Sequence, residues 1–187
     1  TRVRSSAASD VYKRQHLAGA EIELVSLVAR EQRLRTAIET YINTSMTPPD
    51  YVLIDCPPSL GLLTVNAFVA AKEVLIPIQC EYYALEGLSQ LIRSIEMIKK
   101  HLNPELELST ILLTMYDTRT KLASQVADEV KQHFPDQVLS TIIPRSVRVS
   151  EAPSYGKTVI SYDHSSPGAI AYMEAAIEIA NRGARRG

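Results

Sequence analysis

The sequence predicts an α/β fold, a doubly wound and mostly parallel sheet wrapped by helices. Short apolar runs alternate along the chain with longer segments in which apolar residues recur at helical spacing, and this alternation is typical of parallel sheets. The runs at 51–54 and 73–78 are almost continuously apolar, as strands buried on both faces are. Each run stops at polar residues, and ligands of open α/β sheets bind where strands end.

The composition is that of an ordinary globular domain. The chain has 187 residues, of which 45% are hydrophobic and 22% charged. Its net charge of −1 does not by itself indicate nucleic-acid binding, although it allows a local basic patch. The two cysteines show no disulfide or zinc spacing, and no apolar run approaches the length of a membrane span. We therefore expect a cytoplasmic protein without a membrane partner.

The opening segment, residues 1–15, does not resemble part of a fold. It is rich in Ser and Arg and lacks a periodic apolar face. Its last six residues can be encoded by a transposase end sequence that is used in preparing sequencing libraries. We expect residues 1–15 to be adapter-derived or otherwise non-native, and the remainder to be the C-terminal part of a longer protein.

The first native elements are predicted to be a long helix and a buried strand. Apolar residues recur at helical spacing through residues 17–44, and the sequence Thr-Pro-Pro-Asp at 47–50 breaks that pattern. The strand at 51–54 follows and stops at Asp55. It cannot continue, because two prolines come next and proline has no backbone N–H to donate.

The rest of the chain is predicted to alternate between helices and strands. Pro144 ends one strand, Pro135 follows one helix, and Gly183 stops the last helix. The predicted elements are, in order, a helix at 60–71, strands and helices at 73–78, 84–101, 106–114, 120–133 and 138–143, a short strand at 157–161, and a final helix at 167–181.

Asp55 is the first candidate functional residue. A carboxylate at the carboxyl end of a buried parallel strand commonly holds Mg²⁺, directly or through water, beside a phosphate chain. The alternative is that Asp55 caps the next helix, and the local pattern leaves both open. A phosphate cradle is missing, because none of the 7 glycines belongs to a G-x-x-x-x-G-K-[ST] loop. We therefore expect an incomplete sheet whose N-terminal P-loop unit is absent.

Several long blocks resemble the ParA/Soj-type chromosome-partitioning ATPases. The stretch that contains Ile-Asp-Cys-Pro-Pro is similar to the strand and second switch of that family. The likeness covers residues 16–182. The blocks that agree, in the same order as in the family, are residues 17–24, 51–66, 77–88, 112–119 and 143–157.

The resemblance implies a deviant P-loop ATPase that uses ATP and Mg²⁺. Members of the family form an ATP-dependent homodimer, bind DNA without sequence preference and associate with the nucleoid. A ParB-type partner stimulates ATP hydrolysis, and the cycle drives segregation of a chromosome or plasmid. The resemblance places the P-loop before residue 16, so we expect this chain alone neither to bind ATP tightly nor to hydrolyse it.

The resemblance also assigns residues to the nucleotide. Asp55 is similar to the acid of the second nucleotide motif, near Mg²⁺. Pro57 and Pro58 lie in the segment 56–66, which is similar to the switch that senses the γ-phosphate. Two further loops are similar to those that flank the adenine, and their residues are Met115, Asp117, Pro144 and Arg145.

Arg119 and Arg148 match family positions implicated in DNA binding. The planar donor fork of arginine suits contact with phosphates. The alternative for each is an exposed ion pair, which is the commoner role of a surface arginine. The family usually has Asn where Ser146 stands, so the role of that side chain does not carry over.

Three other functions fit the sequence less well. A metabolic ATP-dependent synthetase of the same superfamily, forming an amide or carboxylating its substrate, would bind no DNA. A related branch bridges an iron–sulfur cluster between subunits, but Cys56 and Cys80 fall in blocks that fit the partitioning family and are expected to be small buried thiols. The basic tail, residues 183–187, has one apolar side chain, too few for a membrane-binding helix.

Overall fold

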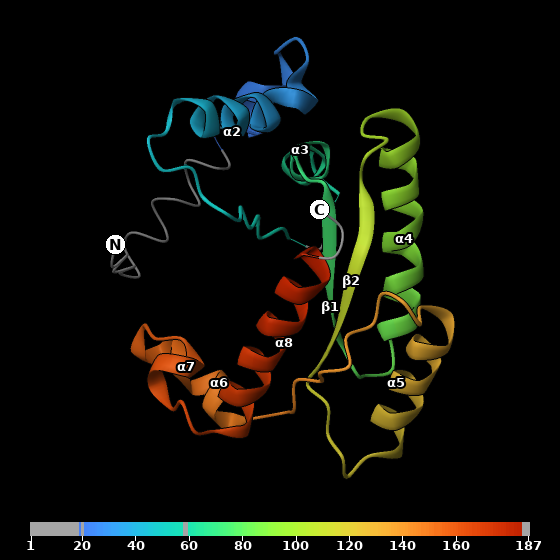
Figure 1. The fold of residues 1–187 in the computed structure, drawn as a ribbon. Helices are drawn as coiled ribbons and strands as arrows, with labels where there is room; N and C mark the ends of the chain where they lie inside the picture. Colours follow the sequence, from blue (N-terminus) through green and yellow to red (C-terminus); the bar gives the residue numbers. More distant parts are fainter. Residues whose placement is uncertain (1–18, 20, 58–59, 185–187) are drawn as a thin grey trace. The chain divides into compact units, whose positions relative to one another are not determined.

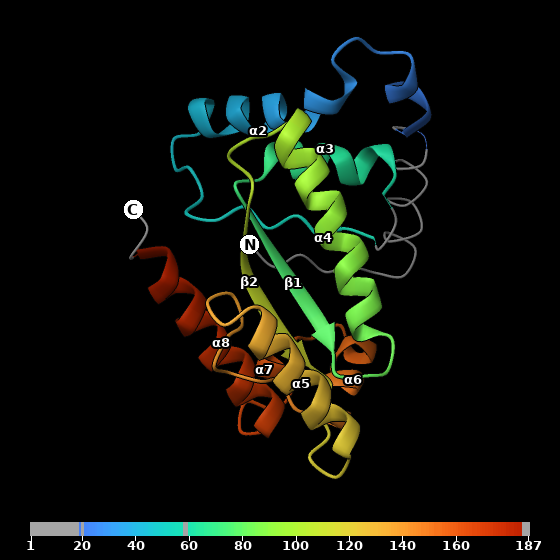
Figure 2. The ribbon, with the colours of Figure 1, turned by 90° about the vertical axis from the view of Figure 1, so that its right-hand side faces the viewer.

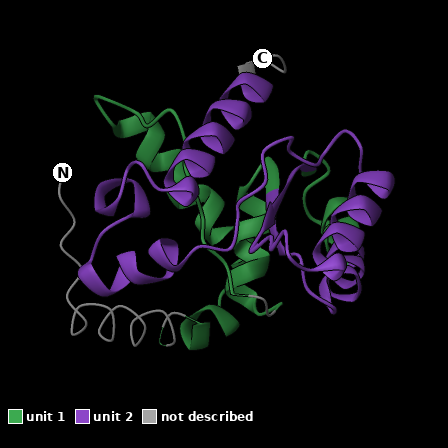
Figure 3. Cartoon of the chain, turned by 90° about the horizontal axis from the view of Figure 1, so that it is seen from below, with its two compact units in different colours: residues 1–74, 94–107 green, residues 75–93, 108–187 purple. Residues whose placement is uncertain are grey.

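The computed structural model describes residues 19, 21–57 and 60–184. Pro58, to which the sequence assigns a nucleotide contact, lies outside the described residues. The chain divides into two compact units (Figure 3). Unit 1 comprises residues up to Val74 together with Ser94–Glu107, and unit 2 comprises Leu75–Arg93 and residues from Leu108 onward.

The long helix predicted at 17–44 is divided in the structure. A short helical stretch at 21–25 is followed by turns, a 3₁₀ helix η1 (Arg30–Gln32) and helix α2 (Arg33–Thr44). The turns at 26–29 end in Ala29, which precedes η1 with a left-handed backbone, φ 53°. A side-chain pattern does not reveal such a backbone reversal, and the prediction of one continuous helix is therefore wrong at 26–29.

Helix α3 (Leu62–Ala70) is the best-buried element of unit 1, and its C-terminus is capped by a distant side chain. The Nδ2 of Asn103 donates to the carbonyl oxygens of Phe68, Val69 and Ala71 at 2.9, 3.2 and 2.7 Å. Asn103 is itself buried. These bonds satisfy carbonyls that a helix end leaves without intrahelical partners.

The strand predicted at 51–54 is absent from the structure. The segment is not a strand and is exposed, with Leu53 91% and Val52 46% accessible. A strand needs a neighbour to pair its N–H and C=O groups, and no described segment forms a ladder with residues 51–57. The apolar run therefore has neither a hydrogen-bonding neighbour nor a covered face, and the prediction of a strand buried on both faces is wrong.

The sheet is parallel, and in the described part of the chain it has two strands, β1 (Glu73–Gln79) and β2 (Glu107–Thr114). Glu107 N–H donates to the carbonyl of Lys72 at one end, and Cys80 N–H donates to the carbonyl of Thr114 at the other. Pairing that advances in the same direction along both strands is parallel. The strands predicted at 73–78 and 106–114 are confirmed within a residue.

A third segment continues the sheet without becoming a regular strand. Residues 138–143, predicted as a strand, run parallel to β2 through isolated bridges at Ile111–Val138 and Tyr116–Pro144. The doubly wound sheet is thus represented by two strands and this bridged segment.

Helices lie on both sides of the sheet in unit 2, although one face of β1 stays exposed. Helix α5 (Lys121–His133) and the first half of helix α4 (Ala84–His101) lie on one face, and helix α8 (Pro167–Ala184) lies on the other (Figures 1 and 2). These three helices confirm the predictions at 84–101, 120–133 and 167–181. The core beneath α8 is formed by Leu112, Leu139, Ile143, Ala171 and Ala175.

Strand β1 is buried on one face rather than on both. Its side chains alternate strictly between buried and exposed, and Val74, Ile76 and Ile78 are the buried ones. Leu75, which points to the other face, is 41% exposed. The continuous apolar run predicted two covered faces, and the structure covers one.

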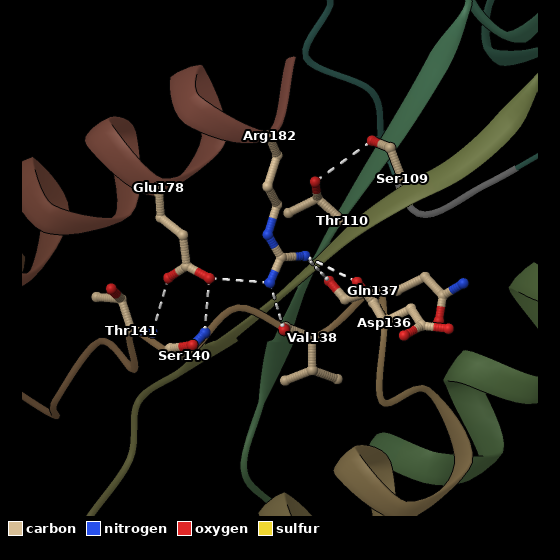
Figure 4. A network of polar contacts seen from close by, with 9 residues as sticks. All are labelled: Ser109, Thr110, Asp136, Gln137, Val138, Ser140, Thr141, Glu178 and Arg182. Carbon is tan, nitrogen blue, oxygen red and sulfur yellow. Dashed lines mark hydrogen bonds and ion pairs between the residues drawn. The ribbon is translucent and has the colours of Figure 1, made fainter. Parts of the chain in front are cut away.

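Arg182 on α8 binds the backbone at residues 136–138, where the bridged segment begins (Figure 4). Its Nη1 donates to the carbonyl oxygens of Asp136 and Gln137, both at 3.0 Å. Its Nη2 donates to the carbonyl oxygen of Val138 at 2.8 Å. The Gln137 carbonyl also accepts from Ile111 N–H of β2, so the guanidinium holds the start of the bridged segment beside the sheet.

The segment predicted as a strand at 157–161 is instead helix α7 (Val159–Tyr162). Its β-branched residues suggested a strand, but the Thr158 hydroxyl caps the helix by accepting from Ser161 N–H at 3.2 Å. Two further short helices precede it, α6 (Val147–Glu151) and η2 (Ala152–Tyr155).

No helix within the described residues has the length and apolar character that crossing a membrane requires.

Candidate functional site

Two of the predicted nucleotide loops lie side by side in unit 2, at the carboxyl end of β2. Tyr116 N–H donates to the carbonyl of Ile143 at 3.1 Å, and Arg145 N–H donates to the carbonyl of Tyr116 at 2.9 Å. Pro144 forms the parallel bridge with Tyr116. The structure therefore brings together the sequence-predicted residues of both loops, namely Met115, Asp117, Pro144 and Arg145.

Met115 turns the chain at the end of β2 with a left-handed backbone, φ 54°. This conformation is uncommon for a residue with a side chain, and it persists when the surrounding structure determines it. The hydrogen bonds of Tyr116 on the C-terminal side and the pairing of β2 on the other supply that constraint. The turn directs the chain away from the strand, so that Asp117 begins a loop.

Asp117 forms a two-pronged ion pair with Arg119. The Arg119 Nε donates to Asp117 Oδ1 at 2.9 Å, and its Nη2 donates to Oδ2 at 2.7 Å. The backbone N–H of Arg119 also donates to Oδ1, at 3.0 Å. The side-chain hydrogen bonds and then this backbone bond hold the pKa of Asp117 well below its usual range, and the positive charge of Arg145 acts in the same direction.

Arg148 lies in a second cluster of charges, on α6. Its Nη1 donates to Glu151 Oε2 at 3.1 Å, and its Nε lies 3.5 Å from Asp163 Oδ2. The Tyr162 hydroxyl donates to the same Glu151 oxygen at 3.4 Å. Burial first, and then the charge of Glu151, raise the pKa of Tyr162. The ring of Tyr162 stacks on Tyr155, with centroids 5.1 Å apart.

Both candidate DNA-binding arginines are therefore exposed and ion-paired. The side chain of Arg119 is 83% accessible and that of Arg148 is 55% accessible. The ion-pair alternative drawn from the sequence describes what the structure shows, and it leaves DNA contact open because exposed pairs exchange partners readily. Sequence reasoning did not assign Glu151, Tyr162 and Asp163 as partners of Arg148. The i, i+3 spacing of Arg148 and Glu151 would have signalled that pair once a helix at 147–151 was recognised.

Asp55 lies in unit 1, within the exposed segment described above, and not at the end of a strand. Pro57 is exposed in the same segment. Cys56 between them is exposed, so the expectation of a buried thiol is wrong there, and it is confirmed for Cys80. Desolvation, and then the charge of Asp55, raise the pKa of the Cys56 thiol.

Asp55 has few neighbours that could serve as metal ligands. Within residues 19, 21–57 and 60–184, no three His, Cys, Asp or Glu side chains are grouped so that they could hold a metal ion. Asp55 offers one carboxylate. Mg²⁺ beside a nucleotide takes one or two carboxylates and fills its remaining positions with phosphate oxygens and water. A lone acid of this kind fits a magnesium ion that arrives with its nucleotide.

A family model described as "AAA domain" matches residues 6–108. Among curated relatives, the sporulation initiation inhibitor protein Soj of Bacillus subtilis is 55% identical over 167 residues, which are 89% of this chain and 64% of Soj. The chromosome partitioning protein ParA of Myxococcus xanthus is 52% identical over 166 residues, 89% of this chain and 57% of ParA. The chain thus spans about six-tenths of the length of these relatives.

The fold is similar to that of cobyrinic acid a,c-diamide synthase from Mycobacterium smegmatis, whose crystal structure contains ADP and magnesium. The TM-score is 0.66 at 37% sequence identity, covering 84% of this chain and 56% of the synthase. The likeness includes the α/β arrangement of parallel strands and flanking helices.

Proposed function

Because this chain belongs to the AAA domain family, and because relatives 52–55% identical to it are Soj and ParA proteins, we propose that it is the C-terminal part of a partitioning ATPase. The observation that carries this proposal is the identity with Soj across 89% of the chain. The printed sequence holds no G-x-x-x-x-G-K-[ST] loop, and the P-loop of the parent protein is proposed to precede residue 16.

The proposed cycle joins nucleotide and DNA. ATP closes a homodimer of the parent protein, and the dimer binds nucleoid DNA without sequence preference. A ParB-type partner stimulates hydrolysis, which releases the DNA and resets the protein. The outcome is segregation of a chromosome or plasmid.

Two sets of residues are proposed to contact the nucleotide, and each set is described within its own unit. Asp55 would hold Mg²⁺, directly or through water, with Pro57 and Pro58 in the adjoining switch. The ion, when bound, would neutralise charge on the phosphates. The loops of Met115, Asp117, Pro144 and Arg145 would flank the base. The Tyr116 bonds support this assignment, since they hold the two loops in a fixed relation before any ligand arrives.

The DNA-binding residues are proposed to be Arg119 and Arg148. Each lies on an exposed loop or helix end of unit 2 and can offer donors to a phosphate. The amide-forming synthetase alternative is supported less well, because the likeness to a diamide synthase is 37% in identity, against 55% for Soj.

The test compares arginine variants of the full-length parent protein in the presence of ATP. Arg119→Ala and Arg148→Ala should each weaken DNA binding and reduce the slope of log K against log salt by about 0.9 for every phosphate that is no longer neutralised. ATP-dependent dimerisation should persist. Arg35→Ala is the matched control, because Arg35 is also exposed and ion-paired, to Glu39, and has no proposed role. Full retention of DNA binding by both variants would remove the support for a partitioning function.

A further inference from the structure

The ion pair between Asp117 and Arg119 uses one edge of the guanidinium, which can also bind a phosphate through two hydrogen bonds. Nε and Nη2 point in parallel from one side of the arginine fork, and both donate to the Asp117 carboxylate, at 2.9 and 2.7 Å. A phosphate recognised bidentately needs two such parallel donors. In this structure both donors of that edge are bonded to the Asp117 carboxylate.

Asp117 is held more firmly than its partner. The neighbouring Tyr116 is bonded on both sides to the 143–145 segment, and the Asp117 side chain is 15% accessible. The Arg119 side chain is 83% accessible, and its backbone N–H is fixed to Asp117 Oδ1. The carboxylate is thus the stationary member of the pair, and the arginine is the member that solvent, or a ligand, can reach.

The pair also removes charge from the surface at which phosphate would arrive. A carboxylate in direct contact with a guanidinium cancels most of its field at distances beyond the pair. The positive charge of Arg145 also acts on Asp117, more weakly than the bonded Arg119. At Arg119, an approaching DNA strand therefore meets an ion pair in place of a free cation.

We propose that the Asp117 carboxylate competes with DNA phosphates for the Arg119 side chain and thereby lowers the DNA affinity of the protein. This inference rests on the proposed function of Arg119. DNA must displace the carboxylate from Nε and Nη2 before a phosphate can be bound through that edge. Asp117 also belongs to a loop that is proposed to contact the nucleotide. Its ion pair therefore joins that loop to Arg119, the proposed DNA contact.

The second arginine is bound in a different way. Arg148 is shared between Glu151 and Asp163, with one contact to each at 3.1 and 3.5 Å. Neither carboxylate takes two donors of one edge. Of the two arginines, only Arg119 therefore faces a competitor of this kind.

The experiment measures binding of the full-length, ATP-bound protein to a fluorescein-labelled DNA duplex by anisotropy, from 50 to 300 mM salt. Asp117→Asn keeps an oxygen that can accept the Arg119 N–H and removes the charge. We expect the DNA affinity of Asp117→Asn to exceed that of the unaltered protein by about two- to fivefold for each Arg119 that is freed. Its affinity should also fall more steeply with salt. Glu39→Gln is the matched control, because it also removes one carboxylate that faces an exposed arginine, Arg35.

Combining variants separates this inference from the proposed function. The gain from Asp117→Asn should vanish in an Arg119→Ala background if Asp117 acts through Arg119. Arg119→Lys offers a second route that leaves Asp117 intact, since a lysine cannot make the two-pronged contact and should bind DNA with less competition. Circular dichroism verifies that each variant is folded.

Each outcome has a defined meaning. If Asp117→Asn binds DNA no more tightly than Glu39→Gln, or more weakly than the unaltered protein, the competitor proposal is overturned. If the gain survives in the Arg119→Ala background, the effect is general charge removal and the proposal is also overturned. If Arg119→Ala alone leaves DNA binding unchanged, it is the proposed function of Arg119 that fails.

Discussion

Glu178 and Arg182 lie one turn apart on α8 and form an ion pair, with Oε1 and Nη2 2.9 Å apart, while both also bind the backbone of residues 136–141 (Figure 4). Glu178 accepts from the N–H groups of Ser140 and Thr141 at 2.9 and 3.0 Å. Arg182 donates to carbonyls earlier in the same segment. Together the two side chains tie α8 to carbonyls at 136–138 and to N–H groups at 140–141.

Arg182→Met should lower the free energy of unfolding. The variant keeps the apolar stem but leaves three backbone carbonyls without their charged donor, and we expect a loss of about 1–3 kcal/mol. Urea unfolding followed by circular dichroism measures it. Arg35→Met is the control, because Arg35 makes a single exposed ion pair, and its loss should be under about 0.5 kcal/mol. Equal effects of the two substitutions would contradict this assignment.

The contribution of Glu178 should depend on pH. Burial alone would raise its pKa, but the hydrogen bonds from Ser140, Thr141 and Arg182 leave the pKa below the ordinary value of 4.5. A group whose pKa is lower in the folded state stabilises the protein fully above its unfolded-state pKa. That contribution disappears as the pH falls through the lowered folded-state pKa.

Glu178→Gln tests this pH dependence. The difference in melting temperature between the unaltered protein and the variant should be largest near pH 7 and should shrink once the pH falls below 4.5. Thermal melts at a series of pH values provide the measurement. A difference that stays constant through the acid range would show that the charge of Glu178 is not involved.

Two helical glycines should respond oppositely to alanine. A Cβ on Gly168 would lie 2.6 Å from Val149 Cγ2, so Gly168→Ala should destabilise the protein by about 1–3 kcal/mol. A Cβ on Gly87 of α4 would meet nothing within 4 Å, and Gly87→Ala should stabilise by about 0.5–1 kcal/mol. The urea midpoints of both variants check the prediction. If both midpoints rise, or both fall, relative to the unaltered protein, the prediction is wrong.

Position 115 should accept asparagine with a smaller loss of stability than valine. Its left-handed backbone suits Asn and penalises β-branched side chains. We expect Met115→Val to be less stable than Met115→Asn by about 1–2 kcal/mol, although valine is the closer match in polarity. Denaturant unfolding of the pair is the measurement. The reverse order would mean that packing of the half-buried side chain outweighs the backbone.

The long periodic elements were predictable from the sequence. Helices α4, α5 and α8 carry apolar stripes over at least three turns, and the runs of β1 and β2 are bounded by polar residues. Elements fixed by one backbone angle or one cap were not predictable. Turns at 26–29, with Ala29 at φ 53°, separate two helical stretches. At 157–161, where β-branched residues suggested a strand, the Thr158 hydroxyl caps a short helix.

The run at 51–54 shows why an apolar stretch alone does not make a strand. Its residues have the composition of a buried strand, but pairing depends on a neighbouring segment, and none of the described segments supplies one. The same limit applies to the site. The family resemblance assigned the loops of Asp117 and Arg145 to one site. It could not show the ion pair with Arg119, which depends on how the chain turns after Met115.

The most direct test of the central claim is the binding of the full-length parent protein to DNA duplexes of unrelated sequence, with and without ATP and Mg²⁺, across a range of salt. A partitioning ATPase should bind them all with similar affinity, only when ATP is present, and progressively more weakly as salt rises. Equal binding with and without ATP, or no binding even at low salt, would contradict the assignment of this chain to such a protein.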